Sequence, residues 1–190
     1  GALPQEVQEE LRRERDRLER EPRRLGESRD GCKLRHEKIV FAMSDRFLNG
    51  ATSGPLHLRD PAAAKIVEDS ILFGTAERYE LFAYVVMANH VHVLLKPKWD
   101  LEDIMQGIKG YTAHEIITLQ GERGRVFWQD ESYDHWTRDE DEFYRIIEYI
   151  ENNPVHAGLC TNSSDWPWSS SRWRPRWPVG QAFQPDKQVP

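Results

Sequence analysis

The sequence predicts an α+β fold, a ferredoxin-like or RRM-like sandwich in which helices pack on an antiparallel sheet. Strand and helix patterns follow one another between residues 38 and 153 in the order strand, helix, strand, strand, helix, strand, helix. This is the order of such a sandwich with one added helix. The chain has 190 residues, of which 38% are hydrophobic, with seven Trp, seven Phe and six Tyr. That content is enough for the core of one ordinary domain.

Four segments have the composition of strands. They are 38–43, 79–87, 90–96 and 126–128, and residues 88–89 form a short turn between the second and the third.

Two helices are expected between these strands. Asp60 and Pro61 open a helix that runs to about Leu72, because Asp is a favoured N-cap and proline is tolerated at the first helical position. Asp100 opens a second helix through about Leu119.

The ends of the chain differ from this region, so we expect three parts. They are a charged helical extension at 1–31, a domain at 32–160, and a partly disordered tail rich in Trp, Pro and Arg at 161–190.

The N-terminal extension has apolar residues at Leu11, Leu18 and Leu25, seven residues apart. Glu14 and Glu21 fill the intervening core positions, so a coiled coil is poorly supported. A solvated helix is favoured over a helix that packs on a partner.

Composition excludes several classes of protein. No run approaches the ~18 apolar residues of a membrane span, and no signal-peptide pattern opens the chain. Two cysteines, Cys32 and Cys160, exclude a zinc ribbon and a disulfide scaffold and favour a reducing cytoplasm. The net charge of -6 does not indicate a nucleic-acid binder by bulk charge, so any such function must depend on a specific site.

His90 and His92 are the first candidate functional residues. Residues two apart in a strand point to the same face, so both imidazoles project together, while Val91, Val93 and Leu95 point into the core. Two imidazoles fixed on a strand are two-thirds of a facial metal site. The alternative is a pair of surface histidines in a hairpin.

The last helix, expected over 139–153 and ended by Pro154, carries the second candidate pair. Its apolar residues form one buried stripe. Tyr149 and Asn153 are four residues apart and lie together on one flank of that stripe, with Glu142 above them. If the helix crosses the sheet, the pair can face the two histidines. The alternative is a tyrosine that anchors the helix and an asparagine that ends it.

Five segments of the chain resemble the single-tyrosine HUH transposases of the IS200-like superfamily, and within them the REP-associated tyrosine transposases of bacteria. The segments are MANHVHVLL (87–95), IKGYTAHE (108–115), FWQDESYDHWTRDEDEF (127–143), YIENNPVHAGL (149–159) and DWPWSS (165–170). The resemblance covers residues 38 to 171. Ala88 stands where this family usually has a proline, which leaves the histidines intact.

The resemblance implies an HUH motif on a central strand and a catalytic tyrosine on the added C-terminal helix. His90 and His92 match the metal ligands, Asn153 the polar third ligand, and Tyr149 the nucleophile. The implied metal is Mg²⁺ or Mn²⁺, and nitrogen ligands favour manganese. The implied reaction nicks and rejoins single-stranded DNA beside a hairpin through a 5′-phosphotyrosine, as in DNA transposition, and the implied substrates are REP palindromes.

Further residues are candidates for DNA contact, although each type also occurs on ordinary protein surfaces. They are Lys109, Tyr111, Gln129, Arg138, Arg172 and Arg174.

Two other functions remain open. A replication initiator or relaxase would use the same metal and tyrosine, but such proteins usually have longer chains. A domesticated, non-catalytic protein would bind a DNA or RNA hairpin, with aromatics of the sheet (Phe41, Tyr79, Phe82 and Tyr84) stacked on bases. The expected partner is single-stranded or hairpin DNA and not a membrane. The expected protein is a monomer or homodimer in the bacterial cytoplasm, associated with the nucleoid.

Overall fold

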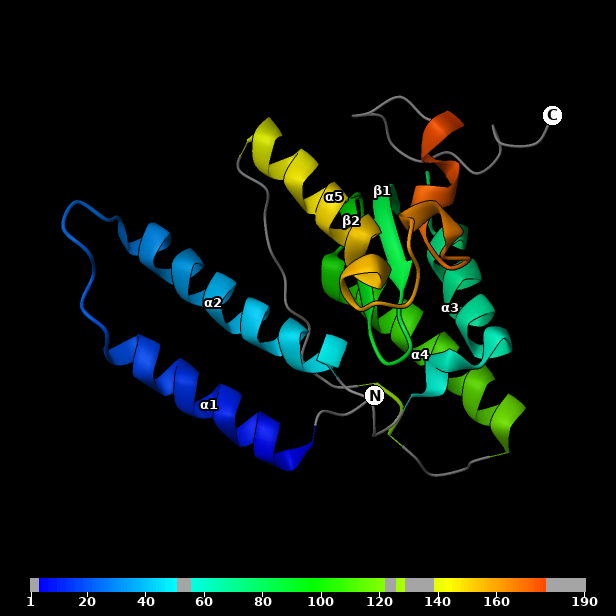
Figure 1. Ribbon diagram of the computed structural model, residues 1–190, viewed down its shortest axis with the longest axis horizontal. Helices are drawn as coiled ribbons and strands as arrows, with labels where there is room; N and C mark the ends of the chain where they lie inside the picture. The colour runs from blue at the N-terminus through cyan, green and yellow to red at the C-terminus, as the bar shows by residue number, and fades with distance from the viewer. Residues whose placement is uncertain (1–3, 51–55, 122–125, 129–138, 177–190) are drawn as a thin grey trace. The chain divides into compact units, whose positions relative to one another are not determined.

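The structure, a computed structural model, describes residues 4–50, 56–121, 126–128 and 139–176, which form two compact units (Figure 1). The first unit contains helices α1 (Gln5–Arg20) and α2 (Arg29–Gly50). The second unit begins at Leu56 and contains every later element.

The first unit is a pair of helices packed through a small apolar core. Leu11 and Leu18 of α1 are buried with Val40 of α2. The expectation of a solvated N-terminal helix is therefore wrong, because α1 has a partner helix in the same chain. The seven-residue spacing of the two leucines is the signal of that packing, whereas Leu25 lies beyond α1 and is fully exposed.

The predicted strand at 38–43 is also wrong, because these residues lie within α2. Val40, Met43 and Phe47 follow one another three and four residues apart and all belong to the core with α1. This spacing is the period of a helix. A window of six residues shows the β-branched composition of the segment but less than two helical turns.

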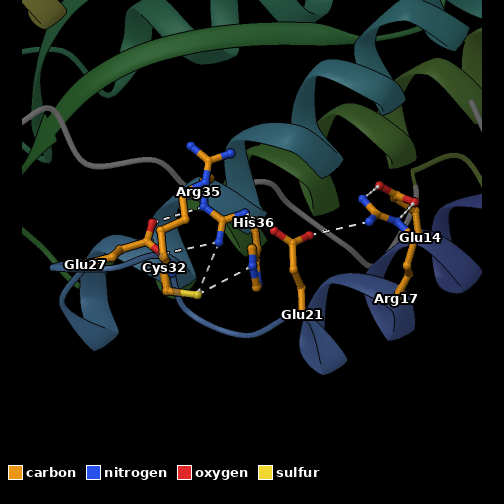
Figure 2. A network of polar contacts seen from close by, with 8 residues as sticks. Glu14, Arg17, Glu21, Glu27, Cys32, Arg35 and His36 are labelled. Carbon is orange, nitrogen blue, oxygen red and sulfur yellow. Dashed lines mark hydrogen bonds and ion pairs between the residues drawn. The ribbon is translucent and has the colours of Figure 1, made fainter.

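Polar contacts hold the connection between α1 and α2 (Figure 2). Arg35 of α2 pairs with Glu21, just past the end of α1, at 2.8 Å and with Glu27 in the connection at 3.0 Å. The hydrogen bond from the Arg35 guanidinium lowers the pKa of Glu27 to about 2.

The second unit is built on an antiparallel pair of strands, β1 (Tyr79–Val86) and β2 (Val91–Pro97). Leu81 pairs with Leu95 and Ala83 pairs with Leu94, so Phe82 is a β-bulge. One inserted residue reverses the alternation of faces along β1. The bulge therefore determines which residues of β1 face each helical layer.

Helices cover both faces of this sheet. The helices α3 (Pro61–Phe73) and α4 (Leu101–Gln120) pack on the face that includes Tyr79, Leu81, Tyr84 and Val86. The helix α5 (Glu140–His156) packs on the other face against Ala83, Val85 and Met87, and Figure 1 shows it crossing the strands. The α+β class with an antiparallel sheet is confirmed.

The predicted fourth strand at 126–128 is wrong, and the described residues contain a sheet of two strands. Phe127 is instead buried in the core beneath α3 and α4, and the Trp128 indole N–H donates to Thr112 Oγ1 at 2.9 Å. The apolar character of this segment reflects burial of its side chains, which three residues cannot distinguish from a strand.

Residues 166–174, named the edge segment, lie beside the edge of β1 that β2 does not occupy. This segment follows the short 3-10 helix η2 (Ser163–Asp165) and enters a second one, η3 (Ser170–Arg176). The Val86 amide donates to the Trp168 carbonyl at 2.8 Å, and Val85 forms a bridge with Ser169. The edge segment thus covers β1 where its backbone would otherwise lack pairing.

Within the described ranges, no helix combines the length and the apolar character needed to cross a membrane.

Candidate active site

The two histidines lie at the start of β2 with their rings together. His92 pairs with Val85, a residue of the core beneath α5, and cross-strand partners point to the same face. His90 immediately precedes β2. The ring centroids of the two imidazoles are 4.8 Å apart at an interplanar angle of 82°. The side chain of His92 is therefore directed to the layer that contains α5.

Asn89 orients the first imidazole, a role that the sequence analysis did not predict. His90 Nδ1 lies 2.7 Å from Asn89 Oδ1, and His90 is buried. An amide oxygen can only accept, so Nδ1 donates and Nε2 of a neutral imidazole keeps its lone pair. A hydrogen bond of this kind usually fixes the tautomer and the ring orientation of a histidine that binds a metal. The position of Asn89 next to the His-x-His pattern is the available sequence signal.

The helix α5 places Tyr149 beside the second histidine. The ring centroid of Tyr149 is 6.0 Å from that of His92, at 70°. Ile147 and Ile150 anchor this stretch of α5 in the core, and Tyr149 is half-buried on the flank. The ring of His156, seven residues later, is 6.4 Å from that of Tyr149. His156 is a further titratable neighbour that the sequence analysis did not single out.

Asn153 is completely buried on the same helix, with a relative exposure of 0%. Within the described part of the chain, neither Oδ1 nor Nδ2 of its amide has a hydrogen-bond partner. Leaving a buried polar group unsatisfied costs about 1–3 kcal/mol, so such a group calls for an explanation. A ligand or ion that binds the amide oxygen would supply one.

The helix α5 begins after a capping aspartate and continues past a proline in its last turn. The side chain of Asp139 accepts a hydrogen bond from the Glu142 amide at 2.7 Å and caps the helix. Pro154 lies inside the helix, so the predicted stop at this residue is wrong. A proline removes one hydrogen bond, which the last turn tolerates, and the helix continues to His156. Asn153 is therefore an interior residue of α5 and does not end it.

The predicted DNA contacts are placed differently. Lys109 and Tyr111 lie on α4, which packs on the opposite face of the sheet from α5, so the structure does not bring them to the histidines. Gln129 and Arg138 lie outside the described residues.

Arg172 and Arg174 form ion pairs within the second unit. Arg172 pairs with Glu68 of α3 at 2.8 Å, and Arg174 pairs with Glu151 of α5. Both glutamates are buried, and burial raises the pKa of Glu68. The sequence does not identify either glutamate as a partner of an arginine. A buried glutamate beside an apolar stripe has the same local sequence pattern as a solvent-exposed glutamate.

The structure places two imidazoles beside a phenol, and the buried amide of Asn153 follows one helical turn after Tyr149 on α5. Nitrogen and oxygen donors of this kind fit a divalent metal ion. A tyrosine beside such an ion can act as a nucleophile toward a phosphodiester. The arrangement is chemically compatible with a metal-assisted phosphoryl-transfer reaction.

Comparisons with known proteins identify the family that this chain resembles. Residues 68–153, which include both histidines, Tyr149 and Asn153, match the family described as "Transposase IS200 like". A REP-associated tyrosine transposase of Escherichia coli (strain K12) is 27% identical over 95 residues, which are 48% of this chain and 54% of the relative. The chain thus spans about half the length of that relative. The resemblance inferred from the sequence is confirmed.

A solved structure supports the fold. It shows a REP-associated tyrosine transposase bound to a REP hairpin and resembles this chain with a TM-score of 0.52 and 22% sequence identity. The similarity covers 71% of this chain and 81% of that one.

Proposed function

We propose that this protein is a metal-dependent transposase that nicks and rejoins single-stranded DNA beside a hairpin, with Tyr149 as nucleophile. One observation carries the proposal. The ring centroid of Tyr149 lies 6.0 Å from that of His92, and the ring centroids of His92 and His90 are 4.8 Å apart. His92 lies on β2, His90 immediately precedes this strand, and Tyr149 lies on α5. Packing of the strand and the helix does not by itself require this set of polar side chains.

In the proposed reaction, His90, His92 and Asn153 would hold a divalent ion. Such an ion would supply Lewis-acid stabilisation of the charge that develops on the phosphate oxygens. A free tyrosine has a pKa of about 10, so Tyr149 must lose its proton as it attacks. The new bond joins the Tyr149 oxygen to phosphorus, and the 3′-oxygen of the preceding nucleotide leaves as a hydroxyl.

The phosphotyrosine keeps the energy of the broken phosphodiester. A 3′-hydroxyl can therefore attack the same phosphorus, release Tyr149 and restore a DNA strand without ATP. This reversal permits strand transfer as well as nicking.

The proposed substrate is a REP-like palindrome folded into a hairpin with a single-stranded flank. The solved structure that resembles this chain contains a REP hairpin. A net charge of -6 implies weak non-specific attraction to DNA, so we infer that recognition depends on the shape of the hairpin and on the metal site.

A gel assay with an end-labelled hairpin oligonucleotide tests the proposal. With Mn²⁺ or Mg²⁺ we expect a shortened strand and a protein–DNA adduct that resists denaturant, and EDTA should abolish both. His92→Ala and Tyr149→Phe should form no adduct. Tyr144→Phe is the matched control, because Tyr144 lies on the same helix but its hydroxyl donates to Glu140. Adduct formation by Tyr149→Phe at the wild-type level would refute the proposal.

The non-catalytic alternative, in which aromatics of the sheet stack on bases, is not favoured. Tyr79 and Tyr84 are completely buried, and Phe41 lies in α2. Phe82 packs edge-on against Phe143 with ring centroids 4.9 Å apart.

A further inference from the structure

The flank of α5 that faces away from Tyr149 is fixed by a buried carboxylate. Glu151 follows Tyr149 by two residues, or about 200° of helical rotation, so Ile150 on the buried stripe separates the two side chains. Glu151 is buried, and Ser170 Oγ donates to its Oε1 at 2.7 Å. Arg174 Nε donates to the same oxygen at 3.0 Å.

The partners of Glu151 are themselves bound to the backbone of β1. Arg174 Nη2 donates to the carbonyl of Phe82, the bulge residue, at 2.9 Å. Ser170 Oγ accepts from the Tyr84 amide at 3.1 Å. The carboxylate of α5 is therefore connected at two points to the strand that pairs with the histidine strand.

We propose that Glu151, Ser170 and Arg174 form a positioning clamp that sets the rotation of α5 about its axis. The clamp thereby holds Tyr149 and Asn153 opposite the histidines. The inference depends on the proposed function for its catalytic meaning. None of the three residues touches the reacting groups, so their effect is exerted through the helix.

Geometry explains why such a clamp is needed. The apolar stripe of α5 packs without strong directionality, so it permits small rotations of the helix. A tyrosine oxygen lies roughly 8 Å from the helix axis, and a rotation of about 20° moves it by about 3 Å. Displacement by about 1 Å can reduce a reaction rate about 100-fold. Hydrogen bonds to a fixed strand restrict this rotation because they are directional.

The simpler explanation is that the Glu151–Arg174 pair only stabilises the fold. Glu68 and Arg172 provide the comparison, because they form a second, partly buried ion pair between the edge segment and a helix. That helix is α3, on the opposite face of the sheet. Breaking the Glu68 pair should therefore loosen the edge segment without rotating α5.

The test compares Glu151→Gln and Ser170→Ala with the matched control Glu68→Gln. Single-turnover cleavage of the hairpin at saturating protein, hairpin affinity, thermal stability and Mn²⁺ affinity without DNA are measured for each. Ser170→Ala leaves the charge unchanged, so its effect on Mn²⁺ affinity reports geometry alone. If either clamp variant fails to fold, the other still tests the proposal.

We expect the clamp variants to cleave about 10- to 100-fold more slowly. Their hairpin affinity should stay within about twofold of wild type, because the DNA contacts are retained. They should also bind Mn²⁺ more weakly, since Asn153 moves with α5. Glu68→Gln should retain the wild-type cleavage rate and Mn²⁺ affinity even where its melting temperature falls.

Clamp variants that cleave and bind Mn²⁺ like wild type, or that lose both only as much as Glu68→Gln does, would overturn the inference. Failure of the wild-type protein to cleave would instead refute the proposed function. The Mn²⁺ affinities would then still decide whether the clamp positions Asn153.

Discussion

The amide of Asn153 is completely buried, and its polar atoms have no hydrogen-bond partner within the described residues. A chain selected only for stability would place an apolar side chain at this point of α5. In the proposed metal site, the amide oxygen binds the ion. We therefore expect this residue to favour metal binding at the expense of folding stability.

The substitution Asn153→Leu separates the effect of this residue on folding stability from its effect on metal binding. Leucine has the same branching and the same number of side-chain heavy atoms as asparagine, and it has a higher helix propensity. It also removes the unsatisfied amide, so the variant should unfold at the same or a higher temperature than wild type. Its Mn²⁺ affinity should fall, since it offers no donor. Calorimetric melting and Mn²⁺ titration check the two results. A large loss of stability with unchanged Mn²⁺ affinity would assign Asn153 to the fold and not to the metal.

At the scale of residues, the sequence predicts which of these side chains share a face. The period of two in a strand places His90 and His92 on one face, and the period of a helix places Tyr149 on one flank with Asn153. The structure brings the rings of His90, His92 and Tyr149 together. Glu151 and Arg174 could not be predicted as partners, because they are 23 residues apart and meet only after the edge segment folds along β1.

Among the elements, the end of α3 packs closely on the start of β1. A Cβ added to Gly74 would lie 2.5 Å from Cε1 of the Tyr79 ring. That ring is completely buried, and its hydroxyl donates to the Ile71 carbonyl, so it has little room to move. Burial also raises the pKa of Tyr79 to about 12, so the hydroxyl remains a donor at neutral pH.

Gly74→Ala should therefore destabilise the protein by about 1–3 kcal/mol through overpacking. Gly110→Ala, in the middle of α4, is the matched control. An added Cβ there meets no heavy atom of the described residues within 4 Å. Because alanine is the better helix former, this control should stabilise by about 0.5–1 kcal/mol. Urea unfolding measures both, and equal effects of the two substitutions would contradict the close approach of Gly74 to Tyr79.

The connection between α1 and α2 should be sensitive to acid. Arg35 holds the pKa of Glu27 at about 2, below its usual value. A depressed carboxyl pKa stabilises the folded state above the pKa of the unfolded chain, and that stabilisation is lost as pH falls through the folded value. Wild type should thus be more stable than Glu27→Gln at pH 6, and the difference should shrink between pH 5 and about 2. Urea unfolding at several pH values measures it, and a constant difference would exclude the Glu27–Arg35 pair as its cause.

The elements also show where local patterns mislead. The hairpin of β1 and β2 and the helices α3 and α4 are close to their predicted bounds, because each has strong periodicity or an N-cap. The composition of segment 38–43 favours a strand, but packing of α2 on α1 makes it helical. The bulge at Phe82 has no local sequence signal, although it determines the faces of β1.

The molecule as a whole carries a net charge of -6, which is unusual for a protein proposed to act on DNA. Non-specific affinity for DNA comes mainly from cationic contacts with phosphate, so this affinity should be low. Under the proposed function, we therefore expect specific binding to depend on the hairpin and the metal site.

A binding comparison tests this expectation. At one fixed salt concentration, a hairpin with a single-stranded flank should bind more tightly than a blunt duplex of the same length. The duplex complex should also be lost first as salt is raised. Fluorescence anisotropy with both labelled oligonucleotides gives the two affinities. Equal affinity for the two forms of DNA would exclude recognition by shape.

The measurement that tests the central claim most directly is the location of the covalent bond to DNA. The protein is incubated with the hairpin and Mn²⁺, denatured and digested, and the adducted peptide is sequenced by mass spectrometry. The account predicts a nucleotide on the peptide that contains Glu148, Tyr149 and Ile150, attached to the tyrosine. Recovery of the nucleotide on any of the other five tyrosines would contradict it.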